Sequence, residues 1–278
     1  MFPILILTLL RRIFLAMAMV IVPSTLVAQK YFSGRNEWGL AVGMSNYYGD
    51  FSSGLNTKHF KPSGALYQKY NFSSYFGLRN QISYLQIQGT SDDVVGLKYQ
   101  NINFQTKVIE AASLVEFNFH PFGTNINDGL TTPYFLLGLS GFWFDPHRLD
   151  KSDVNLRDLR TEQQNKRYSQ IQPAIPIGFG VKSMVSNRQH AGGMIVGFEV
   201  LFRKTYTDYL DDTYKSYGDY KTIKEQQGQG AADWAQSQVL TNGSVVPKGT
   251  MRGDAHLKDW YYFSGFTFSY RFTQQVCR

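Results

Sequence analysis

The chain has 278 residues, of which 15% are aromatic and 18% charged, with 25 glycines, one cysteine and a formal net charge of +7. A single cysteine excludes an internal disulfide framework and a cysteine-based zinc site. A nucleic-acid binder would gather its positive charge on one face or stripe, whereas here the charge is scattered among polar segments. We therefore expect no nucleic-acid partner.

The first 29 residues have the pattern of a secretory signal peptide. A basic pair at positions 11 and 12 precedes an apolar run from Ile13 to Val22, and small residues follow up to Ala28. Because the arginines interrupt the apolar residues, neither half reaches the about 20 residues that a membrane-spanning helix needs. We expect residues 1–29 to be removed and residues 30–278 to form a single exported domain.

Eight later segments alternate between two kinds of side chain with a period of two, which predicts extended strands. The second gives no clear facing, the fifth is apolar on both faces, and two prolines weaken the sixth, because proline cannot donate to a ladder. In chain order the segments are Asn36–Tyr47, Lys61–Phe72, Tyr75–Gln88, Asn103–Phe119, Pro133–Phe144, Ser169–Val181, Gly193–Thr205 and Leu257–Phe272.

The last segment is the most informative, because one of its faces is almost entirely aromatic. A soluble edge strand seldom carries so many rings on one side, whereas a strand facing lipid places rings at the two membrane interfaces. Ser264 is the exception on a face that otherwise comprises Trp260, Tyr262, Phe266, Phe268, Tyr270 and Phe272.

The connections alternate between short and long. Residues 71–74, 121–132 and 184–192 are short or of middling length, whereas residues 48–60, 89–101, 145–168 and 206–256 are long and polar. A short helix is expected in the last long loop, around Gly230 to Ser237. Short turns on one side and long loops on the other are typical of outer-membrane barrels, which have an even number of strands.

The predicted fold is therefore an all-β, eight-stranded antiparallel transmembrane β-barrel with short periplasmic turns and long extracellular loops. Only helices and closed barrels satisfy every backbone group in lipid. This topology places the protein in the lipid of the outer membrane, with both termini in the periplasm and a short periplasmic tail at residues 273–278.

A barrel this narrow is filled by its own side chains. Charges in that space must be paired or hydrogen-bonded, so we expect an ionic network that plugs the lumen rather than a polar pore lining. Lys182 lies near a strand end, and the inward-facing charged set comprises Arg79, Glu110, Glu116, Glu199 and Arg203.

No set of residues indicates catalysis. No pair of the five histidines has the i, i+4 spacing of a zinc protease, and no G-x-S-x-G elbow is present. We expect the protein not to be an enzyme and to hold no cofactor or metal.

The segment from Thr207 to Tyr220 is rich in aspartate and tyrosine. Its carboxylates could bind calcium, but they lack the spacing of a calcium loop, so turn capping or pairing with Lys204 or Lys215 is favoured. A partner-docking loop rich in tyrosine is a second use. The carboxylates are those of Asp208, Asp211, Asp212 and Asp219.

Cys277 follows the last predicted strand by a few residues. A lone cysteine in an exported chain indicates an intermolecular disulfide or a free thiol, and the periplasm favours oxidation. The alternative is a tail residue without a role, and the sequence does not decide between the two.

Several stretches in order along the chain resemble one family. These include EWGLAVGMSNYYGDF, LYQKYNFSSYFGLRNQ, EFNFHPFG, PYFLLGLSGFWFDP, IPIGFGVK, DYLDD and the terminal DWYYFSGFTFSYRF. Together they resemble the PorG-like outer-membrane barrel components of the type IX secretion system. The most specific residues are Asn46, Tyr47, Tyr48, Gly49 and Asp50 in one motif and Asp208, Tyr209, Leu210, Asp211 and Asp212 in the other.

The resemblance implies a structural component of a protein secretion complex. Members of the family associate with a periplasmic ring, made of a lipoprotein and its partner, beneath the outer membrane. On this interpretation the barrel anchors the ring, and Cys277 could form a bond to the ring lipoprotein. The alternative is a free-standing small barrel that acts as a channel, an adhesin or a stress protein.

Overall fold

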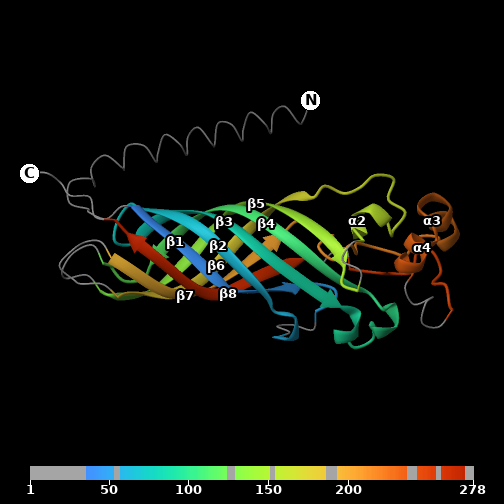
Figure 1. The fold of residues 1–278 in the computed structure, drawn as a ribbon, viewed down its shortest axis with the longest axis horizontal. Coiled ribbons are helices and arrows are strands. Elements are labelled where there is room, and N and C mark those ends of the chain that lie inside the picture. The colour runs from blue at the N-terminus through green and yellow to red at the C-terminus, as the bar shows by residue number, and fades with distance from the viewer. Residues whose placement is uncertain are drawn as a thin grey trace, which may run out of the picture.

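The computed structural model describes residues 36–52, 57–123, 129–150, 154–185, 193–236, 243–254 and 258–272. The predicted signal peptide and the tail that holds Cys277 lie outside these residues. Eight antiparallel strands form a closed barrel in which each strand pairs with its neighbours in the chain and the last pairs with the first (Figure 1). The predicted all-β barrel is therefore confirmed.

The strands start and end close to the residues predicted from the alternation. The seventh has the predicted bounds, whereas the fifth is longer at both ends. They are β1 (Asn36–Tyr48), β2 (Lys61–Asn71), β3 (Phe76–Thr90), β4 (Asn103–Asn118), β5 (Thr131–Arg148), β6 (Ile171–Met184), β7 (Gly193–Thr205) and β8 (Trp260–Arg271).

The register between β1 and β8 closes the barrel. Glu37 lies opposite Arg271 and Tyr48 lies opposite Trp260. The prolines of β6 are accommodated without ending the strand, although the pairing between β5 and β6 is interrupted between Ile177 and Ala174. Pro176 lies in this gap, as expected for a residue that has no backbone N–H to donate.

Side chains alternate between an apolar outer wall and a filled interior, as the pleat of a strand requires. On β2, whose facing the sequence left open, Leu66 is outward and exposed while Tyr67 and Lys69 are buried inside. On β5, Leu137 and Leu139 face outward, whereas Tyr134 and Leu136 face the lumen. An outer wall of exposed apolar side chains is suited to lipid.

The two ends of the barrel differ. The short connections, together with Asn36 and Phe272, lie at one end, called here the turn end, and the long connections lie at the other, the loop end (Figure 1). None of the helices in the described ranges is long and apolar enough to cross a membrane. The helices of the described residues belong to the loop end: η2 (Thr57–His59), η3 (Ser91–Asp93), η4 (Lys98–Gln100), α2 (Leu156–Leu159), α3 (Tyr220–Gln227) and α4 (Gln229–Ala235).

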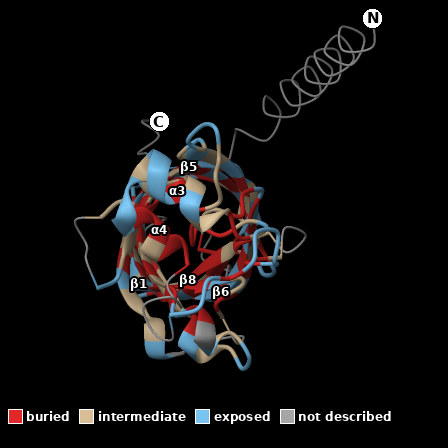
Figure 2. Cartoon of the chain, turned by 90° about the vertical axis from the view of Figure 1, so that its right-hand side faces the viewer, coloured by how far each residue is buried: buried red, intermediate tan, exposed pale blue. Residues whose placement is uncertain are grey.

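The long loops fold into a cap over the loop end. We define the cap as residues 154–170, 206–236 and 243–254. Figure 2 looks onto this end and shows α3 and α4 lying over one side of the barrel mouth, with buried residues beside and beneath them. The helix α4 lies where a short helix was expected from the sequence, and its Ala231, Ala232 and Ala235 pack with Ile223 of α3.

Candidate functional site: the plugged lumen and the loop-end cluster

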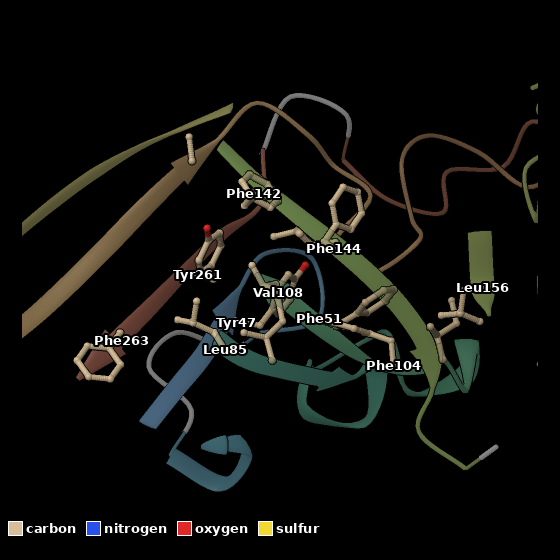
Figure 3. Close-up of a cluster of buried hydrophobic side chains, with 14 of the residues drawn as sticks. Tyr47, Phe51, Leu85, Phe104, Val108, Phe142, Phe144, Leu156, Tyr261 and Phe263 are labelled. Carbon is tan, nitrogen blue, oxygen red and sulfur yellow. The ribbon is translucent and has the colours of Figure 1, made fainter. Parts of the chain in front are cut away.

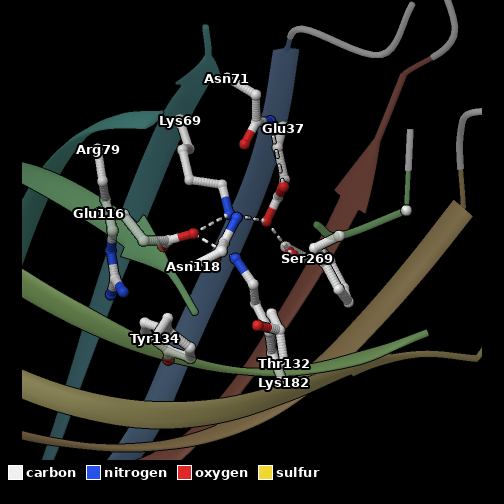
Figure 4. A network of polar contacts seen from close by, with 12 residues as sticks. Glu37, Lys69, Asn71, Arg79, Glu116, Asn118, Thr132, Tyr134, Lys182 and Ser269 are labelled. Carbon is white, nitrogen blue, oxygen red and sulfur yellow. Dashed lines mark hydrogen bonds and ion pairs between the residues drawn. The ribbon is translucent and has the colours of Figure 1, made fainter. Parts of the chain in front are cut away.

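A layer of ion pairs fills the lumen near the turn end (Figure 4). The Lys69 ammonium lies 2.9 Å from both Glu37 Oε1 and Glu116 Oε1. Lys182 also pairs with Glu116, and Arg271 pairs with Glu37 at 3.3 Å. These five side chains are buried. Each charge has an opposite partner within bonding distance, with three basic side chains sharing two carboxylates, and such pairing offsets part of the cost of burial.

Two further ion pairs lie deeper in the barrel. Arg79 binds Glu199 through two parallel hydrogen bonds of 2.7 and 3.0 Å, and the Tyr134 hydroxyl donates to the same carboxylate at 2.8 Å. The guanidinium of Arg79 also stacks on the Tyr67 ring, with its carbon 4.0 Å from the ring centroid. Two parallel hydrogen bonds fix both distance and orientation, so this pair braces β3 against β7 across the lumen.

The second of these pairs joins β4 to β7. Arg203 Nη2 lies 3.0 Å from Glu110 Oε1. The hydroxyl of Tyr261 donates to the other oxygen of Glu110 at 2.8 Å. The charged residues expected to face inward therefore lie in the lumen, and the structure divides them among three separate groups.

Three members of these groups were not singled out in the sequence: Glu37, Lys69 and Arg271. Glu37 precedes the outward-facing Trp38, and Arg271 lies between Tyr270 and Phe272, so strict alternation indicates the inward face for both. Lys69 was missed because the facing of β2 was open. Leu66 is outward and exposed, and alternation along β2 from Leu66 places Lys69 on the inward face.

Above the ion pairs lies a cluster of buried apolar side chains (Figure 3). The rings of Tyr47 and Phe104 meet edge to face with centroids 5.0 Å apart, and Phe142 contacts both Phe144 and Tyr261. Leu210 and Trp234 of the cap pack into the same cluster. Buried side chains thus lie along the lumen from the ion pairs near the turn end to the cap.

The two most specific sequence motifs meet at the top of this apolar cluster. The Tyr47 hydroxyl lies 2.7 Å from Asp211 Oδ2 and 2.8 Å from Asp259 Oδ1. Asp259 also accepts a hydrogen bond of 3.0 Å from the backbone N–H of Leu210. Tyr47, Asp211 and Asp259 are all buried. The phenol therefore ties the end of β1 to both ends of the longest loop.

The other motif residues surround this contact. Asn46 accepts a hydrogen bond from the Tyr47 N–H, whereas Tyr48 points outward. A β-carbon at Gly49 would lie 2.0 Å from the Tyr47 hydroxyl oxygen and 2.4 Å from Asp259 Oδ1. Only glycine leaves room for the phenol here. Tyr209 stacks on Tyr168 with ring centroids 4.3 Å apart.

Three more aspartates of the motifs lie close by, and each has a different partner. Asp212 accepts hydrogen bonds from the Thr161 hydroxyl at 2.8 Å and the Tyr168 hydroxyl at 2.9 Å. Asp208 lies 3.6 Å from the Lys258 ammonium. Asp50 accepts a hydrogen bond of 3.0 Å from the backbone N–H of residue 254. The loop-end cluster, as we use the term, comprises Tyr47, Asp50, Asp208, Asp211, Asp212 and Asp259.

Burial raises the pKa values of these carboxyl groups. The pKa of Asp50 rises to about 6, and those of Asp208 and Asp212 rise to about 7. Burial and the neighbouring carboxyl groups raise the pKa values of Asp211 and Asp259 well above the ordinary range. A protonated carboxyl group can share a hydrogen bond with a phenol without placing uncompensated negative charge under the cap.

The cluster does not form the calcium loop that was weighed from the sequence. Asp219 lies apart from it and caps the N-terminus of α3 by accepting hydrogen bonds from Thr222. Among the described residues, no group of three or more histidine, cysteine, aspartate or glutamate side chains is arranged to hold a metal ion.

The expected lysine partners of these aspartates were wrong. Lys204 lies over the Trp260 ring and Lys215 over the Tyr214 ring, and the ammonium near Asp208 is that of Lys258. The loop sequence does not reveal this partner, because Lys258 is far along the chain and is brought in by the fold.

The fold and the lumen define the class of protein. A closed eight-stranded barrel with an apolar outer wall and a lumen filled by ion pairs has the architecture of a small outer-membrane barrel. Residues 11–242 match the family described as a domain of unknown function, DUF6089, and the chain belongs to that family. No curated protein sequence matches the chain.

Solved structures of outer-membrane barrels are similar to this chain at low identity. The attachment invasion locus protein Ail of Yersinia pestis, in complex with the heparin analogue sucrose octasulfate, is 10% identical with a TM-score of 0.40, covering 86% of this chain and 99% of its own. OprG of Pseudomonas aeruginosa is 13% identical with a TM-score of 0.38, covering 86% and 98%. Neisserial surface protein A is 11% identical with a TM-score of 0.37, covering 85% and 96%.

Proposed function

We propose that the protein is a closed, non-enzymatic scaffold of the outer membrane that serves a type IX protein secretion complex. The observation that carries the scaffold role is the lumen, in which the described residues place three groups of ion pairs and a cluster of aromatic rings. A barrel whose lumen is plugged acts through contacts on its surface rather than as a channel. Contacts of this kind are what a scaffold requires.

The secretion role is supported by the motifs that resemble the PorG-like barrels. The two most specific motifs lie far apart in the sequence, yet their side chains meet in one buried cluster through the Tyr47 phenol. Motifs that form a single structural unit are stronger support for kinship than the same residues scattered over the surface.

We further propose that the turn end faces the periplasm. The short connections lie at this end, as in outer-membrane barrels, and β8 ends there at Arg271. Cys277 follows Arg271 by a few residues, so the proposed partner, the ring lipoprotein with its own partner, would be within reach of the thiol. The exposed cap would then be extracellular.

Co-purification is the direct test of the secretion role. The full chain is solubilised from outer membranes in mild detergent, captured by a tag placed in the exposed loop near Val245, and its partners are identified by mass spectrometry. We expect the ring lipoprotein and its partner to be recovered in constant ratio. Recovery of the barrel without them, together with normal protein export after deletion of the chain, would overturn the proposal.

Cys277 is tested separately. After mild oxidation, a non-reducing gel should show a band of higher mass that contains the chain and the ring lipoprotein, and Cys277→Ser should remove it. An unchanged pattern in this variant excludes the disulfide but leaves a non-covalent anchor to be decided by the co-purification.

The folded cap favours a second function, that of a free-standing barrel that recognises a partner outside the cell. Met251 and Val245 are apolar residues of the cap, and their exposed fractions are 71% and 51%. Contiguous exposed apolar patches mark recognition surfaces, and these two residues are candidates for part of one. Loss of cell or matrix binding after Met251→Ser, with export unaffected, would favour this function over secretion.

A further inference from the structure

The outer wall of the barrel carries a polar row within its apolar band. Gln68 of β2, Asn80 of β3 and Ser113 of β4 are direct neighbours in the ladder. All three point outward, and the Ser113 hydroxyl donates to Asn80 Oδ1 at 2.8 Å. No described residue bonds the amide nitrogen of Asn80 or the amide oxygen of Gln68, so two strong hydrogen-bonding groups face the surroundings of the barrel.

The row lies near the middle of the membrane-facing band. On β3, the outward rings of Phe76 and Tyr84 lie four residues to either side of Asn80, at the two levels where aromatic girdles form. With about 3.3 Å of rise per residue and a strand tilt of about 40°, each ring is about 10 Å from Asn80 along the membrane normal. Unsatisfied amide groups at that depth are costly.

A hollow surrounds the row. It measures about 760 Å³ and lies on the outer face of β1 to β5. Its floor is shallow because Ala111, Ser113 and Gly141 are small, and its rim is formed by Leu66, Ile82 and Leu139, with exposed fractions of 69%, 66% and 71%. Where two protein surfaces meet inside a membrane, small residues let the two backbones approach closely, and polar side chains then form hydrogen bonds across the contact.

From this arrangement we infer that the wall formed by β2, β3 and β4 is the contact between two copies of the chain in the membrane. Copies that share one orientation in a bilayer are related by a two-fold axis along the membrane normal, so each residue meets residues at its own depth. An amide carries both donors and an acceptor and can therefore pair with its own copy. Asn80, at the centre of the row, is placed to meet the Asn80 of the second copy.

Other occupants fit the row less well. An acyl chain could fill the hollow but would leave the amide groups without partners. A lipid headgroup would bond them but does not reside about 10 Å inside the band. A second copy satisfies both the shape and the hydrogen bonding at the depth where they occur. This inference is independent of the secretion role.

Site-specific crosslinking tests the contact in intact outer membranes. In the full chain with Cys277→Ser, Asn80→Cys places one thiol at the centre of the row. Phe198→Cys places one on β7, the opposite wall, where the side chain is also exposed. After oxidation we expect a band of twice the monomer mass for Asn80→Cys and none for Phe198→Cys.

Three crosslinking results would overturn the inference. The first is equal dimer formation at both positions, which indicates random collision. The second is no dimer with either variant while both barrels are folded. The third is a crosslink from Asn80→Cys to a protein of another mass, which assigns the wall to a different partner.

A second measurement guards against artefacts of the introduced thiol. In Gln68→Leu/Asn80→Leu the row loses its amides but the wall keeps its apolar rim. We expect the mass of the protein in the detergent complex, from light scattering, to fall from two chains to one at concentrations where the wild type is dimeric, which reflects at least about tenfold weaker association. Folding is checked by the heat-dependent shift on a gel, and a folded variant that remains dimeric contradicts the inference.

Discussion

The hydroxyl of Tyr47 lies 2.7 Å from the carboxylate of Asp211, although 164 residues separate the two along the chain. The contact joins the end of the first strand to the beginning of the last long loop. Since Tyr47 also bonds Asp259 at 2.8 Å, one phenol holds the loop at two points. The cap is therefore fixed to the barrel from below, by a residue of the barrel wall.

Removing this hydroxyl should loosen the cap without opening the barrel. In Tyr47→Phe the ring can stay in place while Asp211 and Asp259 lose the hydroxyl that both bond, and leaving a buried polar group unsatisfied costs about 1–3 kcal/mol. We expect faster amide exchange and faster protease cleavage in residues 206–254, with unchanged strands. Tyr48→Phe, one residue along and outward-facing, is the matched control. Equal loosening in both variants would show that the phenol of Tyr47 is not the tie.

The cap should be more stable in mild acid than in mild alkali. Burial raises the pKa of Asp212 to about 7, so the folded cap holds a proton that the unfolded loop, with an ordinary pKa of about 3.9, releases. Where the folded state binds more protons, stability falls as pH rises. The stability of the cap therefore falls between about pH 4 and about pH 7 and changes little above that range.

Protease resistance of the cap measured between pH 5 and pH 8 checks this expectation. Asp212→Asn stays neutral at every pH and should make the dependence shallower, because the contribution of Asp212 is lost while Asp50 and Asp208 still titrate. Asp219→Asn changes the residue that caps the N-terminus of α3 and lies outside the loop-end cluster. This variant should keep the pH dependence of the wild type. A cap that becomes more resistant as pH rises would contradict the direction of the shifts.

Breaking one lumenal ion pair should cost more than replacing it whole. Glu199→Gln leaves the buried guanidinium of Arg79 without its counter-charge, which costs about 3–5 kcal/mol. In Arg79→Met/Glu199→Leu no charge remains, and most of that loss should be recovered. The free energy of unfolding in urea, measured for barrels in lipid vesicles, checks both. A double variant as unstable as the single would show that the pair contributes through shape rather than charge.

The barrel should not conduct ions, with or without its last long loop. The ion pairs of Glu37, Glu199 and Glu110 occupy successive levels of the lumen below the apolar cluster. Replacing residues 207–258 by a short glycine-serine turn removes the part of the cap that the last long loop supplies and leaves these levels filled. Planar bilayer recordings of both forms should show a closed protein. Steady single-channel currents from the wild type would contradict a plugged lumen.

The alternation of side chains was sufficient to predict the barrel, since a closed sheet is built from local periodicity and short-range pairing. It placed Glu199 and Arg203 inside correctly because β7 alternates without a break. The alternation could not assign the inward and outward faces of β2, because a polar residue, Gln68, lies on the outward face and disturbs the pattern. That irregularity marks the wall for which we infer a second copy.

The loop-end cluster was beyond prediction from the sequence for a different reason. No periodicity relates Asp259 or Lys258 to the motif residues, because loops bring them together through contacts between distant segments. The motifs indicated that Tyr47 and Asp211 belong to one family pattern. That they touch, and that Gly49 must be small for this to happen, is visible only in three dimensions.

The pair formed by Glu37 and Arg271 belongs to the first and the last strand, and the two residues also lie opposite each other in the ladder. A chain that inserts strand by strand cannot form this pair until every other strand is in place. A slip of two residues in the closing register would keep both side chains inward but pull them apart by about 7 Å along the strands. The ion pair between Glu37 and Arg271 can therefore form only when the last strand has paired with the first in the correct register, so it distinguishes the correctly closed barrel from one closed out of register.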